Sequence, residues 1–214
     1  MADSRYSLQR LNRNSVNRAG EAEVVRQSLY DFQTYVAAGQ TQLIFFQVPQ
    51  GQAGKTKFDT NMETAGSLPA PKRFVIETVE VQFFPGGSPS AFGAPTALAQ
   101  VNDVYTFAQN GFLDLFIGSK SYLTEAPLGR FPPSNRLAVN AAFADATTAA
   151  ANLQSRSGYA SLGGAPYRLE PNVTLVATQN FSVSLNWPVA VALPSTVNAR
   201  VGIVMKGLLY RNSQ

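Results

Sequence analysis

Apolar and polar residues alternate along several short segments of the chain, which is typical of strands that bury one face. In residues 181–187 the predicted buried residues are Phe181, Val183, Leu185 and Trp187. In residues 74–84 they are Val75, Val79, Val81 and Phe83, and Glu77 interrupts the alternation. Similar patterns predict strands at residues 43–48, 101–108, 112–117, 172–178 and 199–210. The last of these is apolar on both faces, as expected of a central strand.

Two segments have helical character instead. In residues 21–36 the apolar positions Val25, Leu29, Phe32 and Val36 are spaced as on one face of a helix. Alternate residues from Tyr30 onward also fit a strand, so we expect a short helix that leads into an extended stretch. The alanine-rich residues 138–153 predict a second short helix, inserted between strands.

These elements predict an all-β fold, a two-sheet jelly-roll (Greek-key) sandwich. The number of strands favours a single jelly roll, and a compact double jelly roll is the variant. We expect a basic N-terminal arm and short helix in residues 1–36 and the jelly-roll domain in residues 37–214. No repeat or linker divides the chain further.

The segment VPQGQAGKTKF, residues 48–58, contains the Gly-Lys-Thr ending of a phosphate-binding loop. Pro49 stands where that loop requires its first glycine, and proline has no N–H to donate to a phosphate. The residues after Thr56 lack helical spacing, although the motif needs a helix there. The segment therefore predicts a loop between strands, with Gly51 and Gly54 supplying backbone freedom and with Lys55 and Lys57 on the surface.

The chain contains neither cysteine nor histidine, which excludes several classes of site. Disulfides, thiolate metal sites and a Ser-His-Asp triad cannot form within one chain. Charged residues make up 14% of the sequence, below the roughly 25% usual for soluble domains. Such a neutral surface suits a protein covered by copies of itself, although a neutral secreted β-sandwich has a similar composition. We expect no catalytic residues, no cofactor and no metal.

The thirteen carboxylates are spread thinly and form no calcium-loop motif. Asp103 and Asp114 lie in or beside predicted strands and could converge as a glycosidase pair. A hydrolase that uses carboxylates alone is therefore a remote alternative, which would need a pocket with two acids within about 10 Å.

The first eighteen residues are a polar basic arm. They contain one acidic residue, Asp3, and four arginines: Arg5, Arg10, Arg13 and Arg18. One interpretation is a solvated chain end. The other is a tail that contacts packaged nucleic acid, another inner partner or neighbouring subunits. Four more residues are candidates for subunit contact: Lys55, Lys57, Arg130 and Phe131.

The sequence has no signal-peptide core and no apolar run of about 18 residues. We therefore expect a protein that neither spans a membrane nor leaves the cell by that route. The glycosylation-like motifs at Asn172 and Asn180 are then chance matches.

Several phrases together resemble structural proteins of phages. They are YSLQRLNRNSVNRAGEAEVVRQ, NMETAGSLPAPKRFVIETVEVQFFPG, DLFIGSKSYLTEAPLGRFPPSNRL and GLLYRNSQ. The chain is similar in this respect to jelly-roll capsid proteins of tailless icosahedral bacteriophages. The resemblance implies a major capsid protein that self-assembles into the virion shell, with other virion proteins as partners. It also implies an arm that faces packaged nucleic acid or an internal lipid layer, and synthesis in the host cytoplasm.

A different class stays open beside the shell protein. A virion spike or vertex protein, or a lectin-like sandwich, would use loop aromatics on a concave surface. The candidates are Tyr122, Phe131, Tyr159 and Tyr167.

Overall fold

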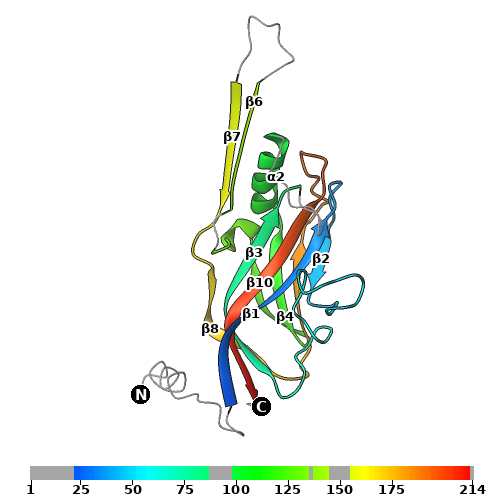
Figure 1. The fold of residues 1–214 in the computed structure, drawn as a ribbon, viewed down its shortest axis with the longest axis vertical. Coiled ribbons are helices and arrows are strands. Elements are labelled where there is room, and N and C mark those ends of the chain that lie inside the picture. The colour runs from blue at the N-terminus through cyan, green and yellow to red at the C-terminus, as the bar shows by residue number, and fades with distance from the viewer. Residues whose placement is uncertain (1–21, 87–97, 135–136, 145–154, 213–214) are drawn as a thin grey trace, which may run out of the picture.

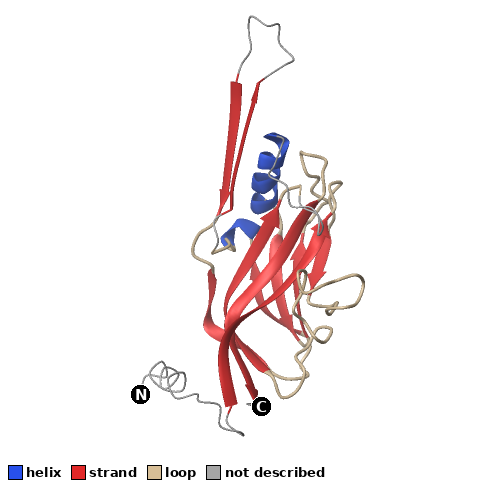
Figure 2. Cartoon of the chain, viewed as in Figure 1, coloured by secondary structure: helices blue, strands red, loops and turns tan. Residues whose placement is uncertain are grey.

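The computed structural model describes residues 22–86, 98–134, 137–144 and 155–212. Eight strands form two antiparallel four-stranded sheets that pack face to face (Figures 1 and 2). The first sheet has the order β1 (Ala22–Tyr35), β10 (Ala199–Asn212), β3 (Arg73–Phe84) and β8 (Tyr167–Leu175). The second has the order β2 (Gln42–Phe45), β9 (Phe181–Asn186), β4 (Phe112–Ile117) and β5 (Lys120–Glu125). The predicted all-β sandwich is thus confirmed.

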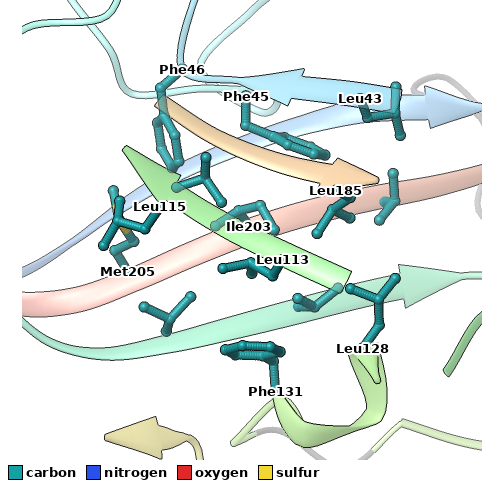
Figure 3. Close-up of a cluster of buried hydrophobic side chains, with 14 of the residues drawn as sticks. Leu43, Phe45, Phe46, Leu113, Leu115, Leu128, Phe131, Leu185, Ile203 and Met205 are labelled. Carbon is teal, nitrogen blue, oxygen red and sulfur yellow. The ribbon is translucent and has the colours of Figure 1, made fainter. Parts of the chain in front are cut away.

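The core lies between the two sheets and follows from the alternation in the sequence. Figure 3 shows Leu113 and Leu115 of β4 packed near Ile203 and Met205 of β10, which belongs to the opposite sheet. All four predicted buried residues of β9 and its flank are buried, including Trp187. The expectation of a central strand at residues 199–210 is also confirmed, because β10 lies between β1 and β3.

Glu77, the residue that interrupts the alternation of β3, marks a β-bulge. The pairing of β3 with β8 shifts between Ile76 and Thr78. Before the bulge the buried residues are Phe74 and Ile76, so the prediction that Val75 is buried is wrong. A bulge adds one residue and exchanges the two faces of the strand, which a fixed period of two cannot anticipate.

The helix predicted within residues 21–36 is a strand. β1 pairs with β10 along its whole length, from Ala22 opposite Asn212 to Tyr35 opposite Ala199. Leu29 is buried, whereas Val36 is exposed, so the helical spacing does not define a common buried face. The ladder of main-chain hydrogen bonds outweighs a weak local preference for helix.

The strand predicted at residues 101–108 is part of a helix, α2 (Leu98–Gln109). Val101, Val104 and Phe107 are all buried, and their spacing of three places them on one helical face. The ring of Phe107 stacks on Phe83 with centroids 4.3 Å apart and also contacts Tyr35 and Trp187. Because these rings belong to the ends of β3, β1 and β9, α2 closes one end of the core.

The predicted helix at residues 138–153 is also wrong where the structure describes it. Residues Leu137–Ala144 form β6, which pairs antiparallel with β7 (Ser155–Leu162). Residues 145–154 lie outside the described residues. The pairing with a distant segment prevails over the helix preference of alanine. The β6–β7 hairpin lies beside α2 at its base and projects beyond the sandwich (Figure 1).

Two glycines of β10 provide a test of how closely the elements pack. A Cβ atom at Gly207 would lie 1.8 Å from the main-chain oxygen of Val75, whereas at Gly202 its three nearest neighbours would be atoms of the Phe32 ring, the closest at 2.0 Å. We expect Gly207→Ala to lower the free energy of unfolding by about 3 kcal/mol and Gly202→Ala by about 1 kcal/mol. The Phe32 ring is held by Arg200 but can still shift more readily than two hydrogen-bonded strands can separate. Urea denaturation of both variants measures the difference. Equal losses would contradict the close approach at Gly207.

Candidate functional site

A groove of about 830 Å³ runs over the outer face of the sheet formed by β1, β10 and β3. One wall is the long loop of residues 46–72, which connects β2 to β3. The groove is lined by Gln27, Ser28, Tyr30, Phe32, Lys57, Phe58, Asn61, Gln82, Phe84, Arg200, Val204 and Lys206.

Aromatic rings form the floor and one side of this groove. The Phe32 ring contacts two other rings of the lining, with its centroid 6.1 Å from that of Tyr30 and 6.3 Å from that of Phe84. The guanidinium of Arg200 lies 4.0 Å from the Phe32 centroid and 4.1 Å from that of Phe58. Phe58 remains 51% exposed, so its ring presents open surface to the groove. A cation between two rings fixes both of them.

Arg200 also ties the loop to the sheet. Its Nη2 donates to the Phe58 carbonyl at 2.7 Å and lies 3.3 Å from an oxygen of Asp59. Burial lowers the pKa of Arg200, and the Asp59 carboxylate opposes that shift. Burial raises the pKa of Asp59, but the hydrogen bonds from Thr56 and Arg200 outweigh it and hold that pKa below its ordinary value. Both groups are therefore ionised at neutral pH.

A second tie is the ion pair of Lys55 with Asp31 of β1. Lys55 Nζ lies 2.5 Å from Asp31 Oδ1, and the Phe46 N–H donates to Oδ2 at 2.7 Å. Asp31 is 0% exposed, and burial raises its pKa against the opposing effects of Lys55 and the Phe46 N–H. Asp31 therefore holds both ends of residues 46–55 against β1, Phe46 by a hydrogen bond and Lys55 by an ion pair.

The loop also covers the outer edge of β1. Asn61 accepts a hydrogen bond from the Tyr30 N–H through its side chain and donates to the Ser28 carbonyl. The Phe32 N–H donates to the Asp59 carbonyl at 2.8 Å. An exposed strand edge is a template for unwanted pairing, and the loop protects residues 28–32 from it.

The structure places the four predicted subunit-contact residues differently from one another. Lys57 is exposed and lines the groove, as expected of a surface lysine. Lys55 is not a solvated residue, because its side chain is only 14% exposed and is paired with Asp31. Arg130 is half-exposed and pairs with Glu125. Phe131 is 1% exposed and belongs to the core, so its ring is not available to a neighbouring subunit. Arg5, Arg10, Arg13 and Arg18 lie outside the described residues.

The glycine-containing loop has the geometry of a turn rather than a phosphate cradle. Gly51 and Gly54 have φ angles of 84° and 76°, which confirms their need for backbone freedom. The Gly51 N–H donates to the Lys55 carbonyl, and the Lys55 N–H donates to the Gln52 carbonyl. No helix follows within the described residues 46–72.

Asp103 and Asp114, the candidate acid pair, have separate structural partners. Asp103 of α2 accepts hydrogen bonds from the hydroxyl and N–H of Ser195, and burial raises its pKa. Asp114 lies on β4 and accepts from Thr124 and Asn186. The groove lining contains no carboxylate. Among the described residues, no cluster of three or more acids could hold a metal ion.

The aromatics proposed for a lectin-like surface do not gather into one site where they are described. Phe131 and Tyr167 contact each other, with centroids 4.8 Å apart, and Phe131 is buried. Tyr122 is exposed on β5 of the other sheet, beside Lys120. The side chain of Tyr159 lies outside what the structure describes.

The groove itself was missed by sequence reasoning. Its lining comes from β1, the loop, β3 and β10, which are up to about 180 residues apart in the chain, as between Gln27 and Lys206. One signal was present in residues 200–206. Arg200, Val204 and Lys206 alternate with the buried core residues and so share the outer face of β10.

A scan against protein-family models and a search of curated proteins found no match to this chain. Within the part of the chain that is described, α2 is too short and too polar to cross a bilayer, and no other helix is long enough. Similarity therefore assigns no family, and the geometry of the surfaces is the basis for a functional proposal.

Proposed function

We propose that the chain is a single jelly roll and serves as a shell-forming capsid protein of a tailless icosahedral phage. The observation that carries the proposal is the nested pairing of the eight sandwich strands. β1 pairs with β10, β2 with β9, β3 with β8 and β4 with β5. This is the pairing of one long antiparallel ribbon folded over on itself, with the β4–β5 connection at its tip. Winding such a ribbon into two sheets gives a jelly roll.

The strand count favours a single roll over a double one. All eight sandwich strands are used in one nested set, and of the described strands only β6 and β7 remain. These two lie in the connection between β5 and β8, as an insertion. A second roll would need a second nested set.

Two further features support self-assembly. The surface is poor in charge, with 14% charged residues. The β6–β7 hairpin projects from the sandwich (Figure 1), and isolated two-stranded hairpins are marginally stable in water unless something packs on them. A neighbouring copy would supply that packing. Weak contacts repeated around symmetry axes give a stable shell. Its location would be the virion, and its partners would be copies of itself and other virion proteins.

Assembly of the purified chain tests the proposal directly. We expect capsomers or closed particles in light scattering and negative-stain images as salt and protein concentration rise. The informative variant replaces residues 138–161 by Asn-Gly, which leaves the paired residues Leu137 and Leu162 on either side of a two-residue turn. We expect this variant to keep the far-ultraviolet circular dichroism of a β protein and to lose closed particles.

The control for the hairpin variant is Tyr122→Ala, which changes an exposed aromatic residue on the other sheet. It should assemble normally under the shell hypothesis. A wild-type chain that stays monomeric under all conditions would overturn the proposal. An isolated trimer that binds a glycan would favour the spike or lectin-like alternative instead.

A further inference from the structure

The groove on the β1-β10-β3 face presents positive charge to solvent. Its lining includes Lys57, Arg200 and Lys206 and no carboxylate. Lys206 pairs with Glu80 at 2.5 Å, but Glu80 is 0% exposed and lies beneath the surface. Arg200 and its partner Asp59 are both buried, so this ion pair presents no charge to solvent. Lys57 has no carboxylate partner among the described residues. The positive charge that the groove presents to solvent therefore comes from Lys57, which is exposed, and from Lys206, whose side chain is 34% exposed.

The groove also offers flat apolar surface next to that charge. Phe58 is half-exposed, and Tyr30 and Phe84 are partly exposed along the same floor. The rings are held in place, since Arg200 fixes Phe58 and the Tyr30 hydroxyl donates to the Lys57 carbonyl. Aromatic faces beside lysines are the surface on which unpaired bases stack while the phosphates are neutralised.

The basic arm does not suit this groove as an occupant. Residues 1–21 precede β1, the strand that supplies Tyr30 and Phe32, and they carry Arg5, Arg10, Arg13 and Arg18. Arm and groove have the same sign of charge, so they repel each other. Both are complementary to a polyanion.

We propose that the groove lined by Tyr30, Lys57, Phe58 and Phe84 binds single-stranded nucleic acid. Charge complementarity selects a polyanion, and the exposed rings select one with unpaired bases. The proposal rests on the proposed function in one respect: in a shell, the β1-β10-β3-β8 face would be the one that lies against the packaged genome.

The test is fluorescence anisotropy of a labelled twelve-nucleotide oligo(dT) with the full-length chain. We expect Phe58→Ala to weaken binding about tenfold, the loss of one stacked base. We expect Lys57→Gln to weaken binding less and to reduce the slope of log K against log salt by about 0.7, the loss of one phosphate contact on a single strand. The arm contributes equally to wild type and variants, so the differences report on the groove.

The chain offers a matched control on the other sheet. Lys120 lies 5.3 Å from the ring of exposed Tyr122, the same pairing of residue types as Lys57 and Phe58. Tyr122→Ala and Lys120→Gln should leave binding unchanged. Ultraviolet cross-linking followed by mass spectrometry should place the oligonucleotide on peptides that contain Tyr30 or Phe58.

Three results would overturn the proposal: equal losses in the control variants, cross-links confined to other peptides, or stronger binding of the same-length duplex than of the single strand. Preferential binding to vesicles of phosphatidylcholine and phosphatidylglycerol, lost in Phe58→Ala, would overturn it in favour of a lipid layer.

Circular dichroism confirms that each variant is folded. Closed particles without groove binding would overturn this inference alone, and groove binding without particles would overturn the proposed function alone.

Discussion

Replacing Lys55 by methionine is expected to lower the free energy of unfolding at pH 7 by about 3–5 kcal/mol, the range found when one partner of a buried ion pair is removed. The reason is the position of Asp31, which is 0% exposed and ion-paired to Lys55. Methionine has similar length but no charge, so the Asp31 carboxylate would be buried without its counterion. Urea denaturation monitored by the fluorescence of Trp187 measures the loss.

The loss should depend on pH in a defined direction. The pKa of Asp31 is raised above its ordinary value of 3.8, chiefly by burial. Between the ordinary and the raised pKa, the folded state binds more protons than the unfolded state, so stability falls as pH rises through that window. Removing Lys55 removes a group that lowers the pKa, which widens the window. The deficit of Lys55→Met should therefore shrink as the pH falls toward 4.

Two further variants show that the effect belongs to the ion pair. Adding Asp31→Asn to Lys55→Met removes the buried charge while an oxygen remains to accept the Phe46 N–H, so most of the stability should return. Lys57→Met is the matched control, because Lys57 is exposed and only two residues away. A Lys55→Met chain as stable as wild type at pH 7 would show that the pair contributes nothing.

Strict alternation was a reliable guide to the sandwich where one face of a strand is buried and the other is solvated. β4 is the clearest case, and β9 follows the same pattern except that Ser184 on its outer face is also buried. Alternation failed as a guide where the outer face is also covered or where one pattern fits two structures. In α2, the apolar positions of residues 101–108 suit either a strand or a helix. The helix forms because it packs Phe107 against rings at one end of the core.

The alanine-rich segment failed for a different reason. Alanine favours a helix in isolation, but residues 137–144 found a partner in residues 155–162. Long-range pairing of this kind has no local signature. β1 is similar, since its partner β10 lies at the other end of the chain.

The candidate site was predicted only in part. The loop character of residues 48–58 followed from Pro49 and the two glycines, because those residues restrict the backbone locally. The role of Lys55 did not follow, since its partner Asp31 lies 24 residues away on another element. The groove likewise depends on the loop folding back over β1, which sequence spacing does not encode.

Replacing Phe131 by alanine is the second large effect that we expect. Phe131 follows a short helix, η1 (Leu128–Arg130), and Figure 3 shows its ring within the buried cluster, near Leu128. The ring also contacts Tyr167, and the main-chain oxygen of Phe131 accepts a hydrogen bond from the Val81 N–H. Truncating a buried phenylalanine removes its transfer free energy and leaves a cavity, so we expect a loss of about 3–5 kcal/mol in the monomer.

The measurement separates a core residue from a subunit contact. Urea denaturation at protein concentrations below the assembly threshold reports on the monomer alone, where a core residue must act. Arg130→Ala is the matched control, since its exposed ion pair with Glu125 contributes at most about 1 kcal/mol. If Phe131→Ala left the monomer stable and abolished only assembly, the ring would act between subunits, as first predicted from the sequence. The burial of Phe131 at 1% exposure favours the opposite result, a destabilised monomer whose assembly fails only as far as its folding does.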